Sequence, residues 1–382
     1  MIQRYDFLIV GAGLYGATFA HFATQSGRKC LVIDKRSHIG GNTYCEKIEG
    51  IVVHKYGPHV FHTSDKEVWD FVNSFIKFNH FRNSPLAISS DGQCYNLPFN
   101  MNTFHQLWGV TTPKEAECII NEQRSISKKQ ILASGYASPK NLEHQALLLV
   151  GEDIYEKFIK GYTRKQWGLD CKELPPYLIE RLPVRFTFDN NYFNDLYQGV
   201  PEGGYNLLIK SLLKGSRIIT NADFFINRTF WEQRARKIIY TGPIDQFFEF
   251  RLGRLPYRTL NFETKILPIS NFQGNAVVNY TSENVPYTRI IEHKHFETFG
   301  DRVYSLPHTI ITKEYPAECR LEDEPFYPIN TQVVGRVVDE YRQLARKEKN
   351  VIFGGRLGEY RYYDMGPIIR NIMDIFKYRT LL

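Results

Sequence analysis

Short apolar runs alternate with amphipathic stretches along much of the chain, as in proteins whose helices cover a parallel sheet. The first run, Phe7-Leu8-Ile9-Val10, predicts a buried strand. The small and apolar residues after it predict a helix, and Gly27 ends that helix. A second buried strand is predicted at Cys30-Leu31-Val32-Ile33, so the chain begins with a strand, a helix and a strand.

The same two patterns recur further along the chain. Strands are predicted at residues 51–54, 217–220, 237–241 and 351–353, and helices at residues 67–78, 205–213, 331–347 and 367–378. From about residue 100 to 165 helical patterns dominate, with a helix start at Thr112-Pro113-Lys114-Glu115 and helices predicted at 116–125, 142–150 and 153–160. From Tyr257 to about Leu306, alternating patterns predict antiparallel strands in a separate sheet.

A glycine motif, Gly11-Ala12-Gly13-Leu14-Tyr15-Gly16, joins the first strand to the first helix. Gly11 permits a tight turn, Gly13 lets the backbone approach a pyrophosphate, and Gly16 lets the helix pack on the strand. The phosphates would bind at the helix N-terminus, where free N–H groups favour an anion. Asp34, at the end of the second strand, would accept a hydrogen bond from a ribose hydroxyl. The alternative is a glycine turn that only packs, but the context favours a dinucleotide site.

A second glycine turn follows at once and bears on the identity of the dinucleotide. Lys35 and Arg36 lead into Ile39-Gly40-Gly41-Asn42. This extension resembles flavoproteins of the glutathione-reductase-like group, in which the chain passes along the far side of FAD. FAD is therefore predicted rather than NAD, with Lys35, Gly41 and Asn42 among its contacts. No second glycine fingerprint follows a strand, so no built-in nicotinamide domain is predicted.

Together these patterns predict an α/β fold with a Rossmann-like FAD-binding domain, a helical insertion and a separate antiparallel sheet. The FAD-binding domain is predicted to be discontinuous, made of residues 1–80, 200–250 and 330–382. Residues 100–180 would form the helical domain, with a mobile loop near residues 165–176. Residues 81–99, 181–199 and 255–329 would form the antiparallel sheet and bind the substrate.

The composition is that of a folded protein, since 43% of the 382 residues are hydrophobic and 14% are aromatic. Lysine and arginine (48) exceed aspartate and glutamate (41) by seven, and the excess is spread along the chain without a basic run. This distribution favours a small anionic substrate over a nucleic acid, which binds concentrated basic faces.

The six cysteines are scattered and form no C-x-x-C pair, which predicts reduced thiols and no zinc site. His59 and His62 lie three residues apart, but no third ligand of matching spacing is near, so no metal is predicted there. No apolar run approaches the roughly 18 residues that a membrane helix needs. No signal peptide is recognised before the first strand. The sequence therefore predicts a cytoplasmic protein without a membrane span.

Several longer motifs follow the glycine turns in a fixed order. They are Gly57-Pro58-His59-Val60-Phe61-His62-Thr63, Gly161-Tyr162-Thr163-Arg164-Lys165-Gln166-Trp167, Arg181-Leu182-Pro183, Asn190-Asn191-Tyr192-Phe193, Pro286-Tyr287-Thr288-Arg289 and Gly354-Gly355-Arg356-Leu357-Gly358-Glu359-Tyr360-Arg361-Tyr362-Tyr363-Asp364-Met365. In this order they resemble the motifs of UDP-galactopyranose mutases of the bacterial type, from Gly11 to Gly366. Two small departures are Asp34, where flavoproteins often carry Glu, and the inserted Tyr363.

The resemblance implies a reaction without net redox change, the interconversion of UDP-galactopyranose and UDP-galactofuranose with reduced FAD. In this family the flavin N5 attacks the anomeric carbon and expels UDP, and the adduct opens to an iminium. The sugar then recloses through its 4-hydroxyl and UDP returns. Holding the departed UDP nearby makes its return effectively unimolecular.

The resemblance also implies the roles of individual residues. Arg181 and Arg289 would hold the diphosphate, because arginine forks match phosphate oxygens, and His62 would lie beside the flavin ring. The substrate contacts implied are Phe158, Tyr162, Thr163, Trp167, Tyr192, Asn279, Tyr327, Tyr362 and Asp364. His59, Arg356 and Met365 match positions near FAD. Trp167 could instead be a core anchor and His59 a hydrogen-bonded structural residue.

Two rival interpretations stay open at this point. One is an amine-oxidase-like flavoenzyme on the same fold, and the other is a binding protein of the GDP-dissociation-inhibitor kind without flavin chemistry. The sequence leaves open whether the sugar carries a 2-N-acetyl group and what reduces the flavin. By resemblance we expect a homodimer that serves the synthesis of a surface polysaccharide.

Overall fold

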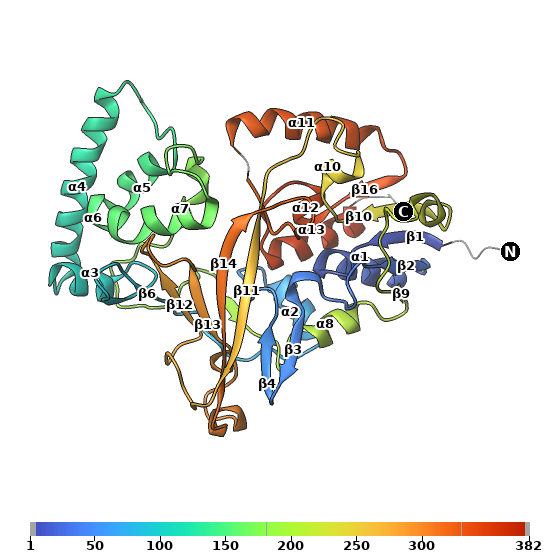
Figure 1. Cartoon of the computed structure of the whole chain (residues 1–382), viewed down its shortest axis with the longest axis horizontal. Coiled ribbons are helices and arrows are strands. Elements are labelled where there is room, and N and C mark those ends of the chain that lie inside the picture. The colour runs from blue at the N-terminus through green and yellow to red at the C-terminus, as the bar shows by residue number, and fades with distance from the viewer. Residues whose placement is uncertain (1–4, 181, 330, 379–382) are drawn as a thin grey trace.

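The computed structural model describes residues 5–180, 182–329 and 331–378, which form two main sheets with helices packed around them (Figure 1). A five-stranded parallel sheet lies on one side of the molecule and a bundle of helices on the other, with a seven-stranded sheet between them (Figure 1). This arrangement confirms the predicted fold class, an α/β Rossmann-like part with a helical insertion and a separate, mainly antiparallel sheet.

The parallel sheet has the strand order β16-β10-β1-β2-β9. Its strands are β1 (Tyr5–Val10), β2 (Cys30–Ile33), β9 (Arg217–Ile219), β10 (Ala235–Tyr240) and β16 (Val351–Phe353). β1 is the central strand and pairs in parallel with β2 and β10, and β2 is buried along its whole length. Strands from three distant parts of the chain therefore complete one sheet, because its central strands need neighbours on both edges and helices on both faces.

Helices cover both faces of the parallel sheet. α1 (Leu14–Gln25) packs against α8 (Tyr205–Leu212) and α13 (Met365–Tyr378) on one face, and α2 (Lys66–Asn73) lies beside them. Aromatic rings tie this face together, since Phe19 stacks edge-on against Phe7 at 5.2 Å and against Phe376 at 5.1 Å. The other face is covered by α9 (Arg228–Glu232), α10 (Ile244–Phe247), α11 (Gln332–Lys347) and α12 (Gly355–Gly358).

The second sheet has the order β15-β11-β14-β13-β12-β6-β7 and is antiparallel except where β12 pairs with β6. Its strands are β6 (Leu86–Ile88), β7 (Cys94–Asn96), β11 (Tyr257–Leu267), β12 (Val277–Tyr280), β13 (Arg289–Glu292), β14 (Thr309–Glu318) and β15 (Tyr327–Pro328). Two small antiparallel pairs join β3 (Cys45–Ile48) to β4 (Ile51–His54) and β5 (Phe61–Thr63) to β8 (Tyr197–Gly199). The alternating pattern ended before β14, so this long strand was missed in the sequence.

The helical part consists of α3 (Met101–Trp108), α4 (Pro113–Ala133), α5 (Leu142–Val150), α6 (Glu152–Ile154), η2 (Tyr155–Lys160), α7 (Gly161–Trp167) and η3 (Pro176–Leu178). Thr112 caps α4 as predicted, in a reciprocal capping box with Glu115, but α4 is one helix of 21 residues and the separate helix at 116–125 was wrong. The helix predicted to end at Lys160 continues through α7, because its first terminator is Gly168, with φ +69°. The first residues of the predicted loop at 165–176 are therefore helical.

Other predicted boundaries move by a few residues. α2 ends at Asn73 rather than at residue 78, and Asp65 caps its start by accepting from the N–H groups of Glu67 and Val68. α13 begins at Met365, two residues before its predicted start. The remaining short helices are η1 (Gly41–Thr43), η4 (His293–Phe296) and η5 (Arg302–Ser305).

Within the described residues no helix is long and apolar enough to cross a membrane. The same ranges contain no group of three or more His, Cys, Asp or Glu side chains placed to hold a metal ion. All six cysteines are free, and burial raises the pKa of Cys30 to about 12 and that of Cys45 to about 11. These two buried thiols act as small apolar packing residues.

Candidate active site

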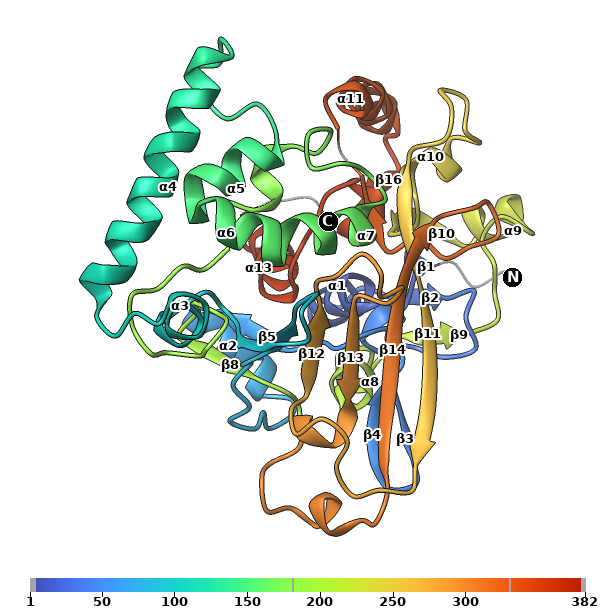
Figure 2. The same ribbon diagram turned by 60° about the vertical axis from the view of Figure 1, so that its left-hand side comes forward.

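A cavity of about 480 Å³ lies where the second sheet meets the helical part and the N-terminus of α13. Both overall views place α7 beside the end of β14 that borders this region (Figures 1 and 2). The predicted site residues that line the cavity are His59, His62, Phe158, Tyr162, Thr163, Trp167, Tyr192, Asn279, Arg289, Tyr327, Arg356, Tyr362, Asp364 and Met365. A cavity of this size suits a small organic ligand.

The other predicted residues lie apart from this cavity. Gly11, Gly13, Gly16, Asp34, Lys35, Gly41 and Asn42 gather around the carboxyl ends of β1 and β2 and the turn after β2. Arg181, predicted to hold the diphosphate, lies outside the described residues. The structure thus contains two separate regions. The glycine turns and the turn after β2, where the dinucleotide is predicted to bind, are called the nucleotide end below, and the other region is the cavity beside α7.

The nucleotide end is a cradle of glycines packed against one another. A Cβ on Gly16 would lie 2.0 Å from the carbonyl oxygen of Gly11, and one on Gly41 would lie 2.9 Å from the Cα of Gly13. Gly13 begins α1 without a side-chain cap, and the first turn of α1 contains no acidic residue. The absence of side chains thus lets the two glycine turns and α1 pack this closely, and the helix N-terminus stays open to an anion such as a pyrophosphate.

Asp34 has a backbone role in this cradle. Its carboxylate accepts from the N–H of Ala12 at 2.8 Å and from the N–H of Arg36 at 2.9 Å. The carboxylate thereby holds the first glycine loop against the turn that follows β2. Its contact with a ribose hydroxyl stays a prediction.

The turn after Asp34 makes a connection that the sequence did not reveal. Lys35 lies 2.7 Å from a carboxylate oxygen of Glu324, and Arg36 donates to the other oxygen at 3.2 Å and to Asn42 at 3.1 Å. The Arg36 guanidinium also stacks over the ring of Tyr56 at 4.3 Å. Its Nη1 is buried and has no hydrogen-bond partner among the residues that the structure describes, so one donor beside the nucleotide end is left for a ligand.

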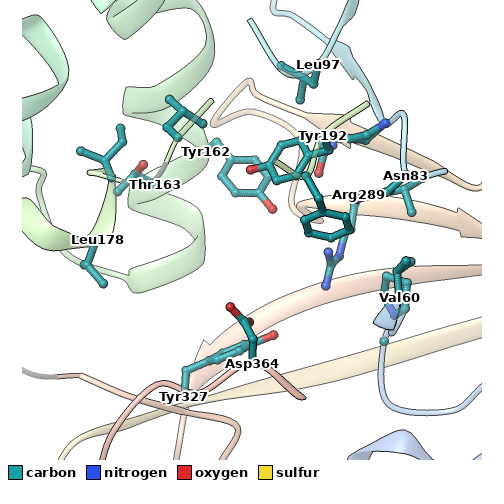
Figure 3. A pocket seen from close by; sticks show the side chains of 18 of the residues that line it. Val60, Asn83, Leu97, Tyr162, Thr163, Leu178, Tyr192, Arg289, Tyr327 and Asp364 are labelled. Atoms are coloured by element: carbon teal, nitrogen blue, oxygen red, sulfur yellow. The ribbon is translucent and has the colours of Figure 1, made fainter. Parts of the chain in front are cut away.

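Arg289 is the cation at the centre of the cavity, and Figure 3 shows its guanidinium pointing into the space between Tyr192 and Asp364. It lies on β13 directly opposite Glu314 of β14, and its Nη2 donates to Glu314 Oε2 at 2.8 Å. Burial lowers the pKa of Arg289, but attraction to and a hydrogen bond with Glu314, together with attraction to Tyr162 and Tyr327, more than offset this, so its pKa lies above the ordinary value. Glu314 is only 1% exposed and was not singled out from the sequence, because nothing there shows which strands pair.

Three tyrosines border the cavity from separate elements: Tyr162 on α7, Tyr192 in the loop before β8, and Tyr327 on β15 (Figure 3). Burial raises the pKa of Tyr162 to about 12 and raises those of Tyr192 and Tyr327 as well. All three hydroxyls are therefore protonated at neutral pH. They can position a ligand through hydrogen bonds but are poor general bases.

Arg356 lies in α12, just after β16, and connects Tyr327 of β15 to the segment that contains Tyr362. Its guanidinium lies 5.3 Å from the ring centroid of Tyr327 and 4.8 Å from that of Tyr362. It also donates to the carbonyl oxygens of Phe326 at 3.3 Å and Tyr363 at 3.0 Å. Arg356 thus fixes the segment that carries Tyr362 and Asp364 into the cavity.

The two histidines of the Gly57–Thr63 motif have different surroundings. His59 Nδ1 hydrogen-bonds the carbonyl oxygen of Gly57 at 2.9 Å, and burial lowers the pKa of His59 to about 4, so it is neutral. His62 Nδ1 lies 2.6 Å from Asp195 Oδ2, and the Phe193 ring stacks on its imidazole. Asp195 was missed in the sequence, since a lone aspartate in a polar loop gives no signal.

α7 carries Tyr162, Thr163 and Trp167 and is anchored at its C-terminal end. Lys165 Nζ donates to the carbonyl oxygens of Tyr280 at 2.6 Å, Tyr287 at 3.0 Å and Val285 at 3.1 Å. Arg258 donates to the carbonyl oxygens of Gln166 and Lys165, which lie in the last turn of α7. The turn between β12 and β13 therefore fixes the helix that faces the cavity.

Three residues predicted to contact the substrate also make structural contacts within the protein. Phe158 is buried and packs edge-on against Tyr95 at 4.9 Å, and Trp167 borders the cavity while also packing on the core of the helical part. Asn279 Nδ2 donates to the carbonyl oxygen of Leu86 at 3.1 Å. Their side chains reach the cavity, but each also joins two elements.

Comparison with known proteins identifies what this architecture is similar to. Residues 157–362 match the UDP-galactopyranose mutase family, and residues 9–75 match the NAD(P)-binding Rossmann-like domain. A probable UDP-galactopyranose mutase of Klebsiella pneumoniae is 39% identical over 374 residues, covering 96% of this chain and 93% of that protein. A dTDP-fucopyranose mutase of Escherichia coli is 38% identical over 375 residues, covering 96% of each. The crystal structure of a reduced UDP-galactopyranose mutase shares the fold, with a TM-score of 0.73 at 14% identity over 98% of this chain and 93% of that one.

Proposed function

The chain belongs to the UDP-galactopyranose mutase family, and on this premise we propose that it interconverts UDP-galactopyranose and UDP-galactofuranose with reduced FAD. The observation that carries the proposal is the cavity in which Arg289, Tyr162, Tyr192 and Tyr327 converge. A buried cation among protonated hydroxyls suits a diphosphate, which offers many acceptors and negative charge.

Arg289 binds the diphosphate in this proposal. Glu314 uses one of its terminal nitrogens, so the remaining N–H groups are free to donate to phosphate oxygens. Tyr162, Tyr192 and Tyr327 add neutral donors around the same point, and Arg181 is the second cation that the family resemblance assigns there. Holding the UDP in place after it leaves keeps it available for the return step.

FAD fits the nucleotide end by three features of the chain. The two glycine turns and α1 pack together without intervening side chains, α1 presents an uncapped N-terminus, and Arg36 keeps a buried donor that has no hydrogen-bond partner among the described residues. When bound and reduced, FAD supplies a nucleophile for the anomeric carbon of the sugar. Met365 and His59 border the cavity where they would contact the cofactor.

The sugar and base would occupy opposite parts of the cavity. Apolar side chains of Leu97, Leu178 and Phe158 line the part near the helical domain, which suits a flat base. His62, Asp364 and Asn279 line the cavity with polar groups, which suit sugar hydroxyls. The residues position the substrate and keep water away, and His62 is the side chain suited to proton transfer.

A second candidate is the interconversion of dTDP-fucopyranose and dTDP-fucofuranose. It is favoured by the 38% identity to a dTDP-fucopyranose mutase, which nearly equals the identity to the galactose enzyme. The two substrates share the diphosphate that Arg289 would bind. They differ in the base methyl, the ribose 2′-hydroxyl and the sugar 6-hydroxyl, so each requires its own assay.

The test is anaerobic turnover of purified protein with UDP-galactofuranose, dTDP-fucofuranose or the 2-N-acetyl form of the first, with and without dithionite. Chromatography of the nucleotide sugars should show UDP-galactopyranose only in the reduced sample. Faster conversion of the fucose compound would move the assignment to the second candidate.

No conversion of any of the three would contradict the mutase proposal, and flavin reduction by an amine with peroxide release would then identify an oxidase. A colourless protein without releasable flavin would point to a binding protein.

A further inference from the structure

His62 and Asp195 form a hydrogen-bonded pair at the edge of the cavity, and only His62 was among the predicted site residues. His62 lies on β5, and its Nδ1 is 2.6 Å from Oδ2 of Asp195. The other carboxylate oxygen of Asp195 accepts from the hydroxyl of Ser64 at 2.7 Å. The Phe193 ring stacks on the imidazole, with centroids 3.7 Å apart and planes 11° apart. The carboxylate and the stacked ring together fix the orientation of the imidazole.

The loop that supplies Asp195 and Phe193 is itself held in place. The Arg185 guanidinium donates to the carbonyl oxygens of Asn191 and Phe193 and to the side chain of Asn194. At the far end of the loop, Gln198 of β8 pairs with His62 of β5 in the backbone register. The same loop carries Tyr192 into the cavity, so one rigid segment positions both a substrate contact and the partner of His62.

The pair determines which ring nitrogen of His62 carries the proton. An ionised carboxylate can only accept, so the hydrogen bond places the proton of a neutral imidazole on Nδ1. Nε2 then has a free lone pair, and within the described residues no group hydrogen-bonds to it. Because His62 lines the cavity, Nε2 is the nitrogen available to a bound ligand.

We propose that Asp195 is a positioning residue, which holds His62 in the tautomer whose Nε2 exchanges a proton with the bound sugar. This inference rests on the proposed mutase function. An isomerisation has no net change in protons, so a base that takes one from a sugar hydroxyl must return one. His62 becomes an imidazolium when Nε2 takes the proton and is neutral again when it gives one back. The Asp195 carboxylate faces Nδ1 and stabilises the cation.

The tautomer can be measured without any turnover. Protein labelled with ¹⁵N-histidine is purified without added substrate, and the His62 signal is identified as the one that is missing in His62→Gln. This signal should be that of a neutral imidazole with Nδ1 protonated and Nε2 bare. In Asp195→Asn the signal should change toward the form protonated on Nε2. A wild-type His62 that is neutral and protonated on Nε2 would overturn the proposal. Since this result does not depend on the substrate, it tests whether Asp195 fixes the tautomer of His62 even if the proposed function is wrong.

Kinetics then test whether the pair matters to the reaction. Asp195→Asn should lower kcat by about tenfold to a hundredfold while KM stays within about threefold, because the substrate contacts are untouched. Asp195→Glu, which keeps the carboxylate, should recover part of the lost kcat. Asp189→Asn is the matched control, an exposed aspartate of the same loop that does not contact His62, and should stay within about twofold of wild type. Equal kcat values in Asp195→Asn and the control would overturn the proposal. If Asp195→Asn does not fold, the tautomer of His62 in the wild-type spectrum is the result that tests the proposal.

Discussion

At the scale of single residues, the cavity depends on charged groups that have lost their water. Arg289 and Glu314 face each other across two strands, and in the described part of the chain Arg289 Nε and Glu314 Oε1 have no hydrogen-bond partner. Burying an ion pair costs desolvation free energy that the attraction only partly returns. Such a pair is poorly explained by stability alone, but an anionic ligand would satisfy the donors that Arg289 keeps free.

Glu314→Gln should therefore destabilise the free protein more than the nucleotide complex. Without the carboxylate the buried Arg289 loses its counter-charge, and we expect the free energy of unfolding to fall by about 3 kcal/mol. UDP would replace the missing charge, so saturating UDP should raise the Tm of Glu314→Gln more than the Tm of wild type. The measurement is thermal unfolding with and without UDP.

The control for this prediction is Glu263→Gln. Glu263 lies on the neighbouring strand β11 and pairs with Lys265 and the Tyr315 hydroxyl near the surface. Its loss should leave the free energy of unfolding close to the wild-type value and leave the UDP shift unchanged. Equal UDP shifts in Glu314→Gln and wild type would show that Arg289 does not bind the diphosphate.

At the scale of elements, two connecting segments tie the second sheet to its neighbours on either side of the site. The segment between β14 and β15 reaches from the second sheet to the turn after β2, where Glu324 meets Lys35 and Arg36. At the other end, the turn between β12 and β13 holds α7 through Lys165. The second sheet is thus tied both to the nucleotide end and to the helix that faces the cavity.

The Glu324 contact leads to a prediction about cofactor retention. Glu324→Gln should release FAD about threefold to tenfold faster, because Lys35 and Arg36 lose the carboxylate that keeps the turn beside the cradle closed; the modest size reflects partly exposed charges. Flavin fluorescence after dilution measures the release rate. Glu322→Gln, in an exposed position of the same segment, should release FAD at the wild-type rate. If both variants matched wild type, the ion pairs would have no part in holding the cofactor.

At the scale of the whole molecule, a row of buried histidines connects the small β3–β4 pair to the second sheet. The N–H of His54 donates to His293 Nδ1 at 3.3 Å, and His293 Nε2 hydrogen-bonds the Thr312 hydroxyl at 2.7 Å. Burial lowers the pKa of His293 to about 3 and lowers that of His54 well below its ordinary value. Both side chains are neutral in the folded protein across the range in which free histidines become charged.

This network makes the stability of the protein sensitive to acid. Below about pH 6.5 the unfolded chain binds protons at these positions and the folded protein does not. The free energy of unfolding therefore decreases as the pH is lowered. Each histidine contributes about 1.4 kcal/mol per pH unit until the pH approaches its folded-state pKa. His293→Asn should flatten the slope by about that amount, as measured by urea unfolding between pH 4.5 and 7.5.

The control here is His80→Asn. His80 is exposed, so its replacement should leave the pH slope of the unfolding free energy unchanged. The slope is the decisive quantity, because a lower overall stability of His293→Asn would be expected from the lost hydrogen bonds alone. An unaltered slope in His293→Asn would mean that this histidine is protonated in the folded protein.

What the sequence determined by itself was local. β2 was placed to the residue, and the glycine turns and the Thr112 cap of α4 were also found, because each depends on neighbours in the chain: apolar periodicity, positive φ angles and side-chain caps. The motif order also pointed to the family and so to the residues that now line one cavity. Helix ends were less certain, as the run from η2 into α7 shows, since no local residue stops it before Gly168.

Only the tertiary structure decided the partners of those residues. Glu314, Asp195 and Glu324 reach Arg289, His62 and Arg36 across separations of 25, 133 and 288 residues. Strand pairing and loop packing bring them together, and an acidic residue in a strand or loop does not reveal which cation it will meet. The sequence thus specified which groups could do chemistry, and the fold decided which of them are charged, oriented and desolvated, because those properties depend on neighbours that are distant in the chain.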